Sequence, residues 1–228
     1  KRQLGRLTYS QNFEDVKGAF LVVEAVPEKI EIKKDTFKKV DELADAETII
    51  VSNTSGLSIS EIASVTNRQD KVMGAHFFYP APVMKLLELV RGLVTSDETY
   101  DVVKEFAGKI GKTTVDAPEF PGFMVNRILV PMQNEAAFMV MEGSKPEDVD
   151  NAMKLGCNHP MGPIELTDFV GIDTMLATMT GLYNGFHDSK YRPCPLLETM
   201  VKSGMLGKKT GQGFYKYDEK GNKIGSNF

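Results

Sequence analysis

The stretch AFLVVEAVPEKIEIKKDTFKKVDELADAETIIVSN, residues 19–53, carries the clearest fold signal in this chain. Its two ends, residues 19–26 and 47–53, are short apolar runs rich in β-branched residues, which predicts two buried strands. Between them, apolar residues recur near helical spacing with lysines opposite, which predicts an amphipathic helix. These apolar residues are Ile30, Phe37, Val40 and Leu43. A strand, a helix and a second strand in this order predict parallel strands joined by a right-handed crossover.

The chain that follows extends the same pattern. Residues 71–78, KVMGAHFF, predict a third buried strand, and residues 85–90, KLLELV, suit a strand that returns beside it. Residues 112–117, KTTVDA, add a last short strand. Two capping-box patterns begin helices between these strands, Ser58 with Glu61 and Thr95 with Glu98. We therefore predict an α/β fold that contains the C-terminal part of a doubly wound, Rossmann-like domain.

The sequence pattern changes at APEFPG, residues 117–122, where two prolines and a glycine end the alternation of strands and helices. Helical periodicity dominates the residues that follow. We place a domain boundary there, between residues 1–118 and residues 119–228. The helix expected over residues 123–142 is apolar nearly all round. Its polar arc consists of Asn126, Arg127, Gln133 and Asn134. Such a helix needs cover on several sides, which predicts an all-α domain that forms a homodimer.

Composition excludes several classes of function. The 228 residues carry a net charge of −4 and scattered lysines, so no nucleic-acid or anionic-membrane partner is expected. No apolar run approaches the roughly 18 residues that a spanning helix needs. The two cysteines, Cys157 and Cys194, lack CxxC spacing and favour a reducing cytosol or organelle matrix. Cys157 and His159 find no second pair of ligands nearby, so no metal site is expected.

His76 and Glu88 are the strongest candidates for catalysis. His76 ends a predicted core strand, where open α/β sheets bind ligands, and Glu88 lies in the predicted returning strand. Glu88 can accept the Nδ1–H of His76 and leave Nε2 free to take a proton from a substrate hydroxyl. Spacing alone slightly favours another interpretation, in which His76 is a satisfied core histidine and Glu88 faces solvent at a sheet edge.

Two further polar residues could donate hydrogen bonds to a reacting oxygen. Ser55 follows a strand in SNTSG, although it could equally form a Ser/Thr turn. Asn126 lies on the polar arc of the apolar helix, where a contact with the backbone is about as probable.

The motifs around these residues resemble those of the L-3-hydroxyacyl-CoA dehydrogenases, particularly the short-chain 3-hydroxybutyryl-CoA type, across essentially the whole chain. The matching motifs are LVVEAVPE, SNTSGLSI, HFFYPAPVMKLLEL, PGFMVNRIL, AMKLGCNHPMGPIELTDFVG, DSKYRPCPLL and GKKTGQGFY. The resemblance implies an NAD-binding domain followed by a helical dimerisation domain, with NAD as cofactor and an acyl-CoA thioester as substrate. It also implies that His76 is the general base, that Glu88 orients it, and that Ser55 and Asn126 contact the substrate.

The resemblance also assigns residues to the cofactor. The positions that match the family's contacts near the nicotinamide half of NAD are Glu28, Lys33 and Tyr79, and Ser55 and Lys209 match further cofactor contacts. From the sequence alone, Glu28, Lys33 and Lys209 would be placed on a solvated charged face. Tyr79 departs from the family, which usually has asparagine there, and Gly56 replaces the family's second serine in NTSS.

The chain also lacks the family's first strand, its GxGxxG turn and the acidic residue that holds the adenosine ribose. GxGxxG lets the backbone approach the pyrophosphate, so we expect this polypeptide to bind NAD(H) poorly and to expose apolar strand surface. Two alternatives remain open: oxidation of another 3-hydroxy acid, such as a sugar acid, and a non-catalytic, crystallin-like or dimerisation role.

Overall fold

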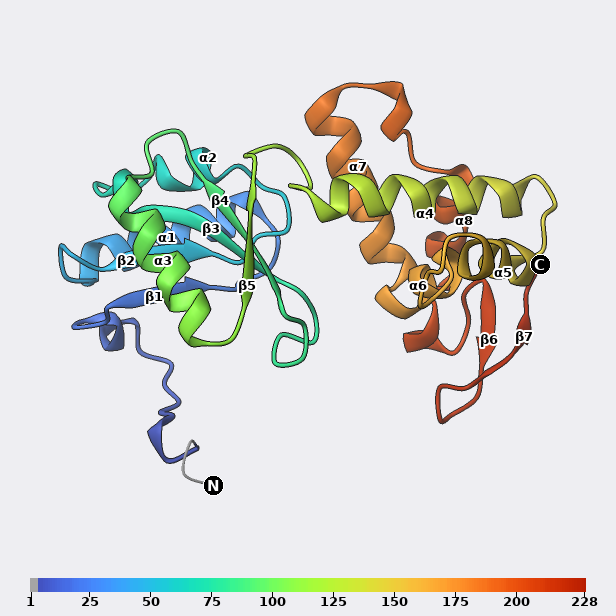
Figure 1. The fold of residues 1–228 in the computed structure, drawn as a ribbon, viewed down its shortest axis with the longest axis horizontal. Helices are drawn as coiled ribbons and strands as arrows, with labels where there is room; N and C mark the ends of the chain where they lie inside the picture. The colour runs from blue at the N-terminus through green and yellow to red at the C-terminus, as the bar shows by residue number, and fades with distance from the viewer. Residues whose placement is uncertain (1–3) are drawn as a thin grey trace. The chain divides into compact units, whose positions relative to one another are not determined.

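The computed structural model describes residues 4–228, which form two compact units (Figure 1). The first unit ends at Phe123, and the second comprises Met124–Phe228. The sequence pattern placed the boundary after residue 118, before the end of the proline-rich segment. We describe each unit separately.

The first unit is built on a five-stranded sheet with the order β1-β2-β3-β4-β5. The strands are β1 (Leu21–Glu24), β2 (Ile49–Ser52), β3 (Val72–Phe77), β4 (Leu86–Arg91) and β5 (Thr113–Ala117). Neighbouring strands are parallel except β3 and β4, which are antiparallel. The predicted parallel crossover and the predicted returning strand are both confirmed.

Helices cover both faces of this sheet (Figure 1). Buried side chains of α1 (Ile30–Leu43) and α2 (Ile59–Ala63) pack with one face, and those of α3 (Asp97–Lys109) pack with the other. Three short 3-10 helices complete the unit, η1 (Leu4–Arg6), η2 (Phe13–Val16) and η3 (Gln69–Lys71). This doubly covered sheet is the predicted α/β architecture.

The helix N-termini follow the sequence signals with one correction. Ser58 caps α2 as predicted, because its Oγ accepts the backbone N–H of Glu61 at 3.1 Å. The predicted cap at Thr95 is wrong: the cap of α3 is Ser96, whose Oγ accepts from the N–H of Thr99. Thr95 instead donates its hydroxyl to the carbonyl of Val72 at 2.6 Å, because it lies against β3.

The second unit is helical with one appended hairpin. Its helices are α4 (Val125–Met141), α5 (Pro146–Gly156), α6 (Pro163–Val170), α7 (Ile172–Phe186), α8 (Pro195–Lys202), η4 (Ser189–Tyr191) and η5 (Lys208–Thr210). The hairpin consists of β6 (Tyr215–Tyr217), which pairs antiparallel with β7 (Lys223–Ser226). Helix α6 and strand β7 were not predicted: α6 buries its apolar residues only against the rest of this unit, and the residues of β7 are mostly exposed.

One buried carboxylate ties the hairpin to the helices. Asp168, on α6, is fully buried and accepts the backbone N–H groups of Phe214 and Tyr215 at 2.9 and 2.8 Å. It also accepts the hydroxyl of Tyr217 at 3.1 Å. A side chain at Gly213 would lie 2.1 Å from the Asp168 carboxylate, so glycine permits this close approach. Burial raises the pKa of Asp168 from 3.8 to about 6, although these donors oppose the rise.

This raised pKa predicts that acid stabilises the second unit through Asp168. The folded state holds the proton more tightly than the unfolded state, so the contribution is complete below pH 3.8 and is lost as the pH rises through about 6. We expect the free energy of unfolding to fall by about 1 kcal/mol between pH 5 and pH 7 from this group. Urea unfolding of wild type and Asp168→Asn at both pH values measures the difference. An equal pH dependence in the two proteins would contradict the assignment.

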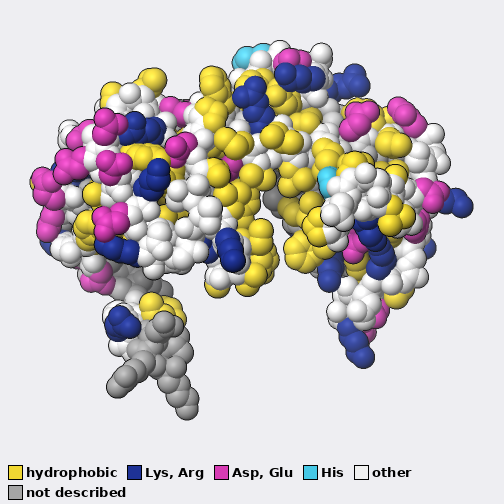
Figure 2. Space-filling view, viewed as in Figure 1, with side chains coloured by type: hydrophobic (Ala, Val, Ile, Leu, Met, Phe, Trp, Pro, Cys, Tyr) yellow, Lys and Arg dark blue, Asp and Glu magenta, His cyan; other side chains and the backbone are white. Residues whose placement is uncertain are grey.

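Charged side chains of both signs are interspersed on the face that Figure 2 shows, and neither sign forms a continuous surface there. Among residues 4–228, no helix is long and apolar enough to cross a membrane.

Candidate active site

His76 and Glu88 face each other across the antiparallel pair β3 and β4. They are direct partners in the strand register, so their side chains leave the same face of the sheet. The Nδ1 of His76 lies 2.7 Å from Oε2 of Glu88. His76 is 5% exposed and Glu88 is 0% exposed, which excludes a solvent-facing Glu88. The geometry therefore agrees with the interpretation in which Glu88 forms a hydrogen bond with Nδ1 of His76.

Aromatic rings surround the imidazole. The ring centroid of Phe78 lies 4.6 Å from that of His76, and the centroid of Phe123 lies 5.8 Å away. A carboxylate that accepts from Nδ1–H fixes the tautomer of the ring and leaves Nε2 unprotonated. The arrangement can therefore accept a proton at Nε2 and stabilise the resulting imidazolium through Glu88.

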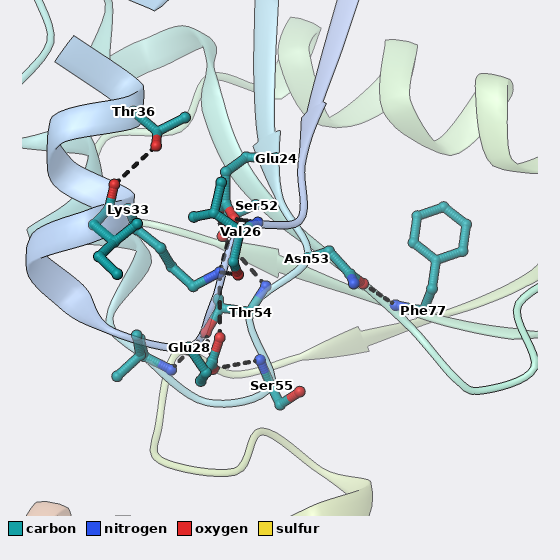
Figure 3. A network of polar contacts seen from close by, with 12 residues as sticks. Glu24, Val26, Glu28, Lys33, Thr36, Ser52, Asn53, Thr54, Ser55 and Phe77 are labelled. Atoms are coloured by element: carbon teal, nitrogen blue, oxygen red, sulfur yellow. Dashed lines mark hydrogen bonds and ion pairs between the residues drawn. The ribbon is translucent and has the colours of Figure 1, made fainter. Parts of the chain in front are cut away.

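A second polar cluster lies at the ends of β1 and β2, and Lys33 is its centre (Figure 3). The Lys33 side chain is 1% exposed, and its Nζ donates to Oε1 of Glu24 at 2.8 Å and to the carbonyl of Val26 at 3.3 Å. Nζ also lies 3.2 Å from Oε2 of Glu28. The expectation that Lys33 lies on a solvated charged face is therefore wrong, because all three of its donors have partners inside the unit.

Glu28 connects this cluster to Ser55 (Figure 3). Its Oε1 accepts the hydroxyl of Thr54 at 2.5 Å and the backbone N–H of Ser55 at 2.8 Å. In the same loop, Oδ1 of Asn53 accepts the backbone N–H of Phe77 at 2.8 Å. The segment that carries Ser55 is therefore held both to the Lys33 cluster and to the end of the strand that carries His76.

The remaining candidates are Tyr79, Asn126 and Lys209. Tyr79 follows β3 and is 85% exposed. Asn126 is in the first turn of α4, and Lys209 is in η5, so both belong to the second unit. Lys209 forms an ion pair with Asp173, at the start of α7. Burial alone would raise the pKa of Asp173, but the hydrogen bond and charge of Lys209 bring that pKa below its usual value.

Sequence reasoning missed the partners of Lys33. Glu24 is 4% exposed at the end of β1, and its Oε2 accepts the hydroxyl of Ser52 at 2.6 Å. Two signals were available: a glutamate ends the apolar run LVVE, and Lys33 follows Ile30 by three positions, on the apolar side of the helix. Among residues 4–228, no group of three or more His, Cys, Asp or Glu side chains could hold a metal.

Comparison with known proteins identifies the family. Residues 1–120 match the family model of the 3-hydroxyacyl-CoA dehydrogenase NAD binding domain. Residues 122–217 match that of the 3-hydroxyacyl-CoA dehydrogenase C-terminal domain. The chain belongs to the 3-hydroxyacyl-CoA dehydrogenase family.

Individual relatives support the same assignment. The chain is 53% identical over 221 residues to a probable 3-hydroxybutyryl-CoA dehydrogenase of Bacillus subtilis, a match that covers 96% of this chain and 77% of the relative. It is 45% identical over 199 residues to the human mitochondrial hydroxyacyl-coenzyme A dehydrogenase, covering 86% of this chain and 63% of that protein. The crystal structure of (S)-3-hydroxybutyryl-CoA dehydrogenase from Ralstonia eutropha superposes with a TM-score of 0.91 at 47% identity, covering 95% and 77% of the two chains.

The 3-hydroxyacyl-CoA dehydrogenase family is NAD-dependent, so the first unit should offer groups that can bind NAD. Polar side chains gather at the carboxyl ends of parallel β1 and β2, where open α/β sheets bind nucleotides. The Glu28 carboxylate is 44% exposed there while two donors and Lys33 hold it in place. The exposed Glu28 carboxylate can accept hydrogen bonds from a polar ligand such as NAD. No GxGxxG for the pyrophosphate occurs in the 228 residues.

Proposed function

We propose that this protein interconverts L-3-hydroxyacyl-CoA and 3-oxoacyl-CoA, with 3-hydroxybutyryl-CoA as the short-chain substrate. The observation that carries the proposal is the buried His76–Glu88 pair, with 2.7 Å between Nδ1 and Oε2. A histidine oriented by a carboxylate suits a reaction in which a hydroxyl loses its proton as hydride leaves the same carbon. The names of the 3-hydroxybutyryl-CoA dehydrogenase relatives support the short acyl chain.

In the direction of oxidation, Nε2 of His76 removes the proton of the substrate hydroxyl. Glu88 stabilises the imidazolium that forms, since a full negative charge lies beside Nδ1 in a buried site. Ser55 and Asn126 donate hydrogen bonds to the reacting oxygen or the thioester, where charge develops. NAD supplies the hydride acceptor when it is bound.

The cofactor contacts divide into two kinds. Glu28 and Tyr79 would contact the nicotinamide half of NAD, and Ser55 and Lys209 would also contact the cofactor. Lys33 supports Glu28, because its three donors are used inside the protein. We expect weak NADH binding by the 228-residue chain, because nothing in it replaces the GxGxxG backbone.

A comparison of two proteins tests the function. One is the 228-residue chain, and the other is the same chain preceded by the glycine-rich strand, turn and helix of a relative. Whichever of the two oxidises NADH with 3-oxobutyryl-CoA becomes the assay protein. We expect turnover with the CoA thioester and at least about 10-fold lower kcat/KM with free 3-oxobutyrate, because the CoA contacts are lost. Equal rates on the free acid, or no turnover of the thioester by either protein, would refute the proposal.

We also propose that the protein forms a homodimer and works in a reducing compartment. Ile128 of α4 is 71% exposed and Leu155 of α5 is 86% exposed, and large exposed apolar side chains favour association of the helical unit with a second copy. Cys157 and Cys194 are both unpaired, which supports the cytosol or an organelle matrix.

A further inference from the structure

The last residues of the first unit, 118–123, form a connector. The second unit begins at the next residue, Met124. Two turns shape the connector: the N–H of Phe120 donates to the carbonyl of Pro118 at 2.8 Å, and the N–H of Phe123 donates to the carbonyl of Phe120 at 2.9 Å. The connector therefore has a defined conformation within the first unit.

Glu119 joins the connector to two other segments. Its Oε1 accepts the hydroxyl of Ser58 at 2.8 Å and the backbone N–H of Ser60 at 2.5 Å. Its Oε2 accepts the hydroxyl of Ser60 at 2.6 Å. The Ser60 oxygen in turn accepts the backbone N–H of Leu93 at 2.7 Å, in the loop after β4. The Glu119 carboxylate thus joins the connector to the start of α2 and, through Ser60, to the loop that follows the strand carrying Glu88.

The far end of the connector reaches the candidate active site at two points. A Cβ on Gly56, the neighbour of Ser55, would lie 2.7 Å from the backbone nitrogen of Gly122. The side chain of Phe123 is 1% exposed, and its ring lies 5.8 Å from that of His76. Phe123 has a φ of 48°, a left-handed conformation that is strained for a bulky residue and persists only where its surroundings require it.

The geometry points to Glu119 as a positioning residue for the His76–Glu88 pair. Its three hydrogen bonds hold the connector so that Phe123 stays on the imidazole and Gly122 stays beside the Ser55 turn. Loss of the carboxylate releases the connector, and the imidazole then gains freedom and water. The effect on turnover rests on the proposed function, whereas the effect on the environment of His76 does not.

Glu119→Ala and Glu119→Gln, made in the assay protein, separate this role from simple stability. Glutamine keeps an oxygen for Ser58 and the N–H of Ser60, and its amide can donate to the Ser60 oxygen. We expect kcat to fall about 10- to 10²-fold in Glu119→Ala with KM within about 3-fold, and to recover to within about 3-fold of wild type in Glu119→Gln. Glu61→Gln is the matched control, because Glu61 lies on α2 and is exposed.

Proton–carbon NMR correlation of the histidine Cε1–H groups reports on positioning without any turnover. The chain has three histidines, so His76 can be assigned by substitution. Ring currents from Phe78 and Phe123 shift the His76 resonance, and we expect it to move in Glu119→Ala and in Phe123→Leu. The resonances of His159 and His187 should stay in place, and so should all three in Glu61→Gln.

The outcomes are distinct. A wild-type His76 resonance and wild-type kcat in Glu119→Ala would overturn the positioning role. A kcat loss that only follows the folded fraction, measured by thermal unfolding, would also overturn it. If the wild-type protein itself lacks turnover, the proposed function fails, while the NMR shift still decides the role of Glu119.

Discussion

Replacing His76 by asparagine should reduce turnover of 3-oxobutyryl-CoA by about 10²- to 10⁴-fold, the range for loss of a general acid–base group. Asparagine can place an N–H close to the position of Nδ1 and keep the hydrogen bond that Glu88 accepts at 2.7 Å in the wild type. It offers no group that can take or return the proton. The loss should therefore appear in kcat, while NADH affinity, measured by titration calorimetry, should remain that of the wild type.

His187→Asn is the matched control for this experiment. His187 is exposed at the end of α7 with a φ of 52°, a conformation that asparagine adopts readily. We expect wild-type turnover from this variant. Full activity in His76→Asn would show that another group transfers the proton and would remove the central claim of the proposed function.

Replacing Lys33 by methionine should lower the free energy of unfolding by about 3–5 kcal/mol, because it leaves Glu24 as an uncompensated buried charge. Lys33 and Glu24 are each 1% exposed at the side chain and lie 2.8 Å apart. The variant should also release Glu28 and with it the Ser55 turn. Urea unfolding followed by far-UV circular dichroism measures the loss, since the chain has no tryptophan for fluorescence.

A double-mutant cycle assigns this loss to the charge. Lys33→Met combined with Glu24→Gln should regain part of the stability, because both charges are then removed. Lys38→Met is the control, since Lys38 lies on the exposed face of the same helix. A Lys33→Met protein as stable as Lys38→Met would show that the buried pair contributes nothing.

Local patterns are sufficient to predict much of the first unit. Apolar runs and helical spacing predict β1, α1, β2, β3 and β4, because each of these elements buries a face that its own residues define. The register of two strands then makes His76 and Glu88 neighbours, since a turn between antiparallel strands sets which residues are opposite. The spacing of twelve residues allows this pairing but did not by itself decide between a buried and a solvent-facing Glu88.

Other features depend on contacts between distant segments. Lys33 resembles many surface lysines in the sequence, and only its enclosure by Glu24, Val26 and Glu28 makes it a buried charge. The cap of α3 is Ser96 and not Thr95, because Thr95 has a partner on β3. Local propensity carries no information about such partners, which are set by how the elements pack.

The α/β class and the helical character of the second unit can be read from the amino-acid sequence, whereas the spacing of His76 and Glu88 left two interpretations open. Hydrophobic periodicity and strand register are local, so they are visible in one dimension. Packing in three dimensions sets which charges are buried, how Asp168 attaches the hairpin, that Glu119 binds Ser60, and that Phe123 lies beside His76. Those features join residues that are far apart in the chain, and desolvation and hydrogen bonding act on distance in space.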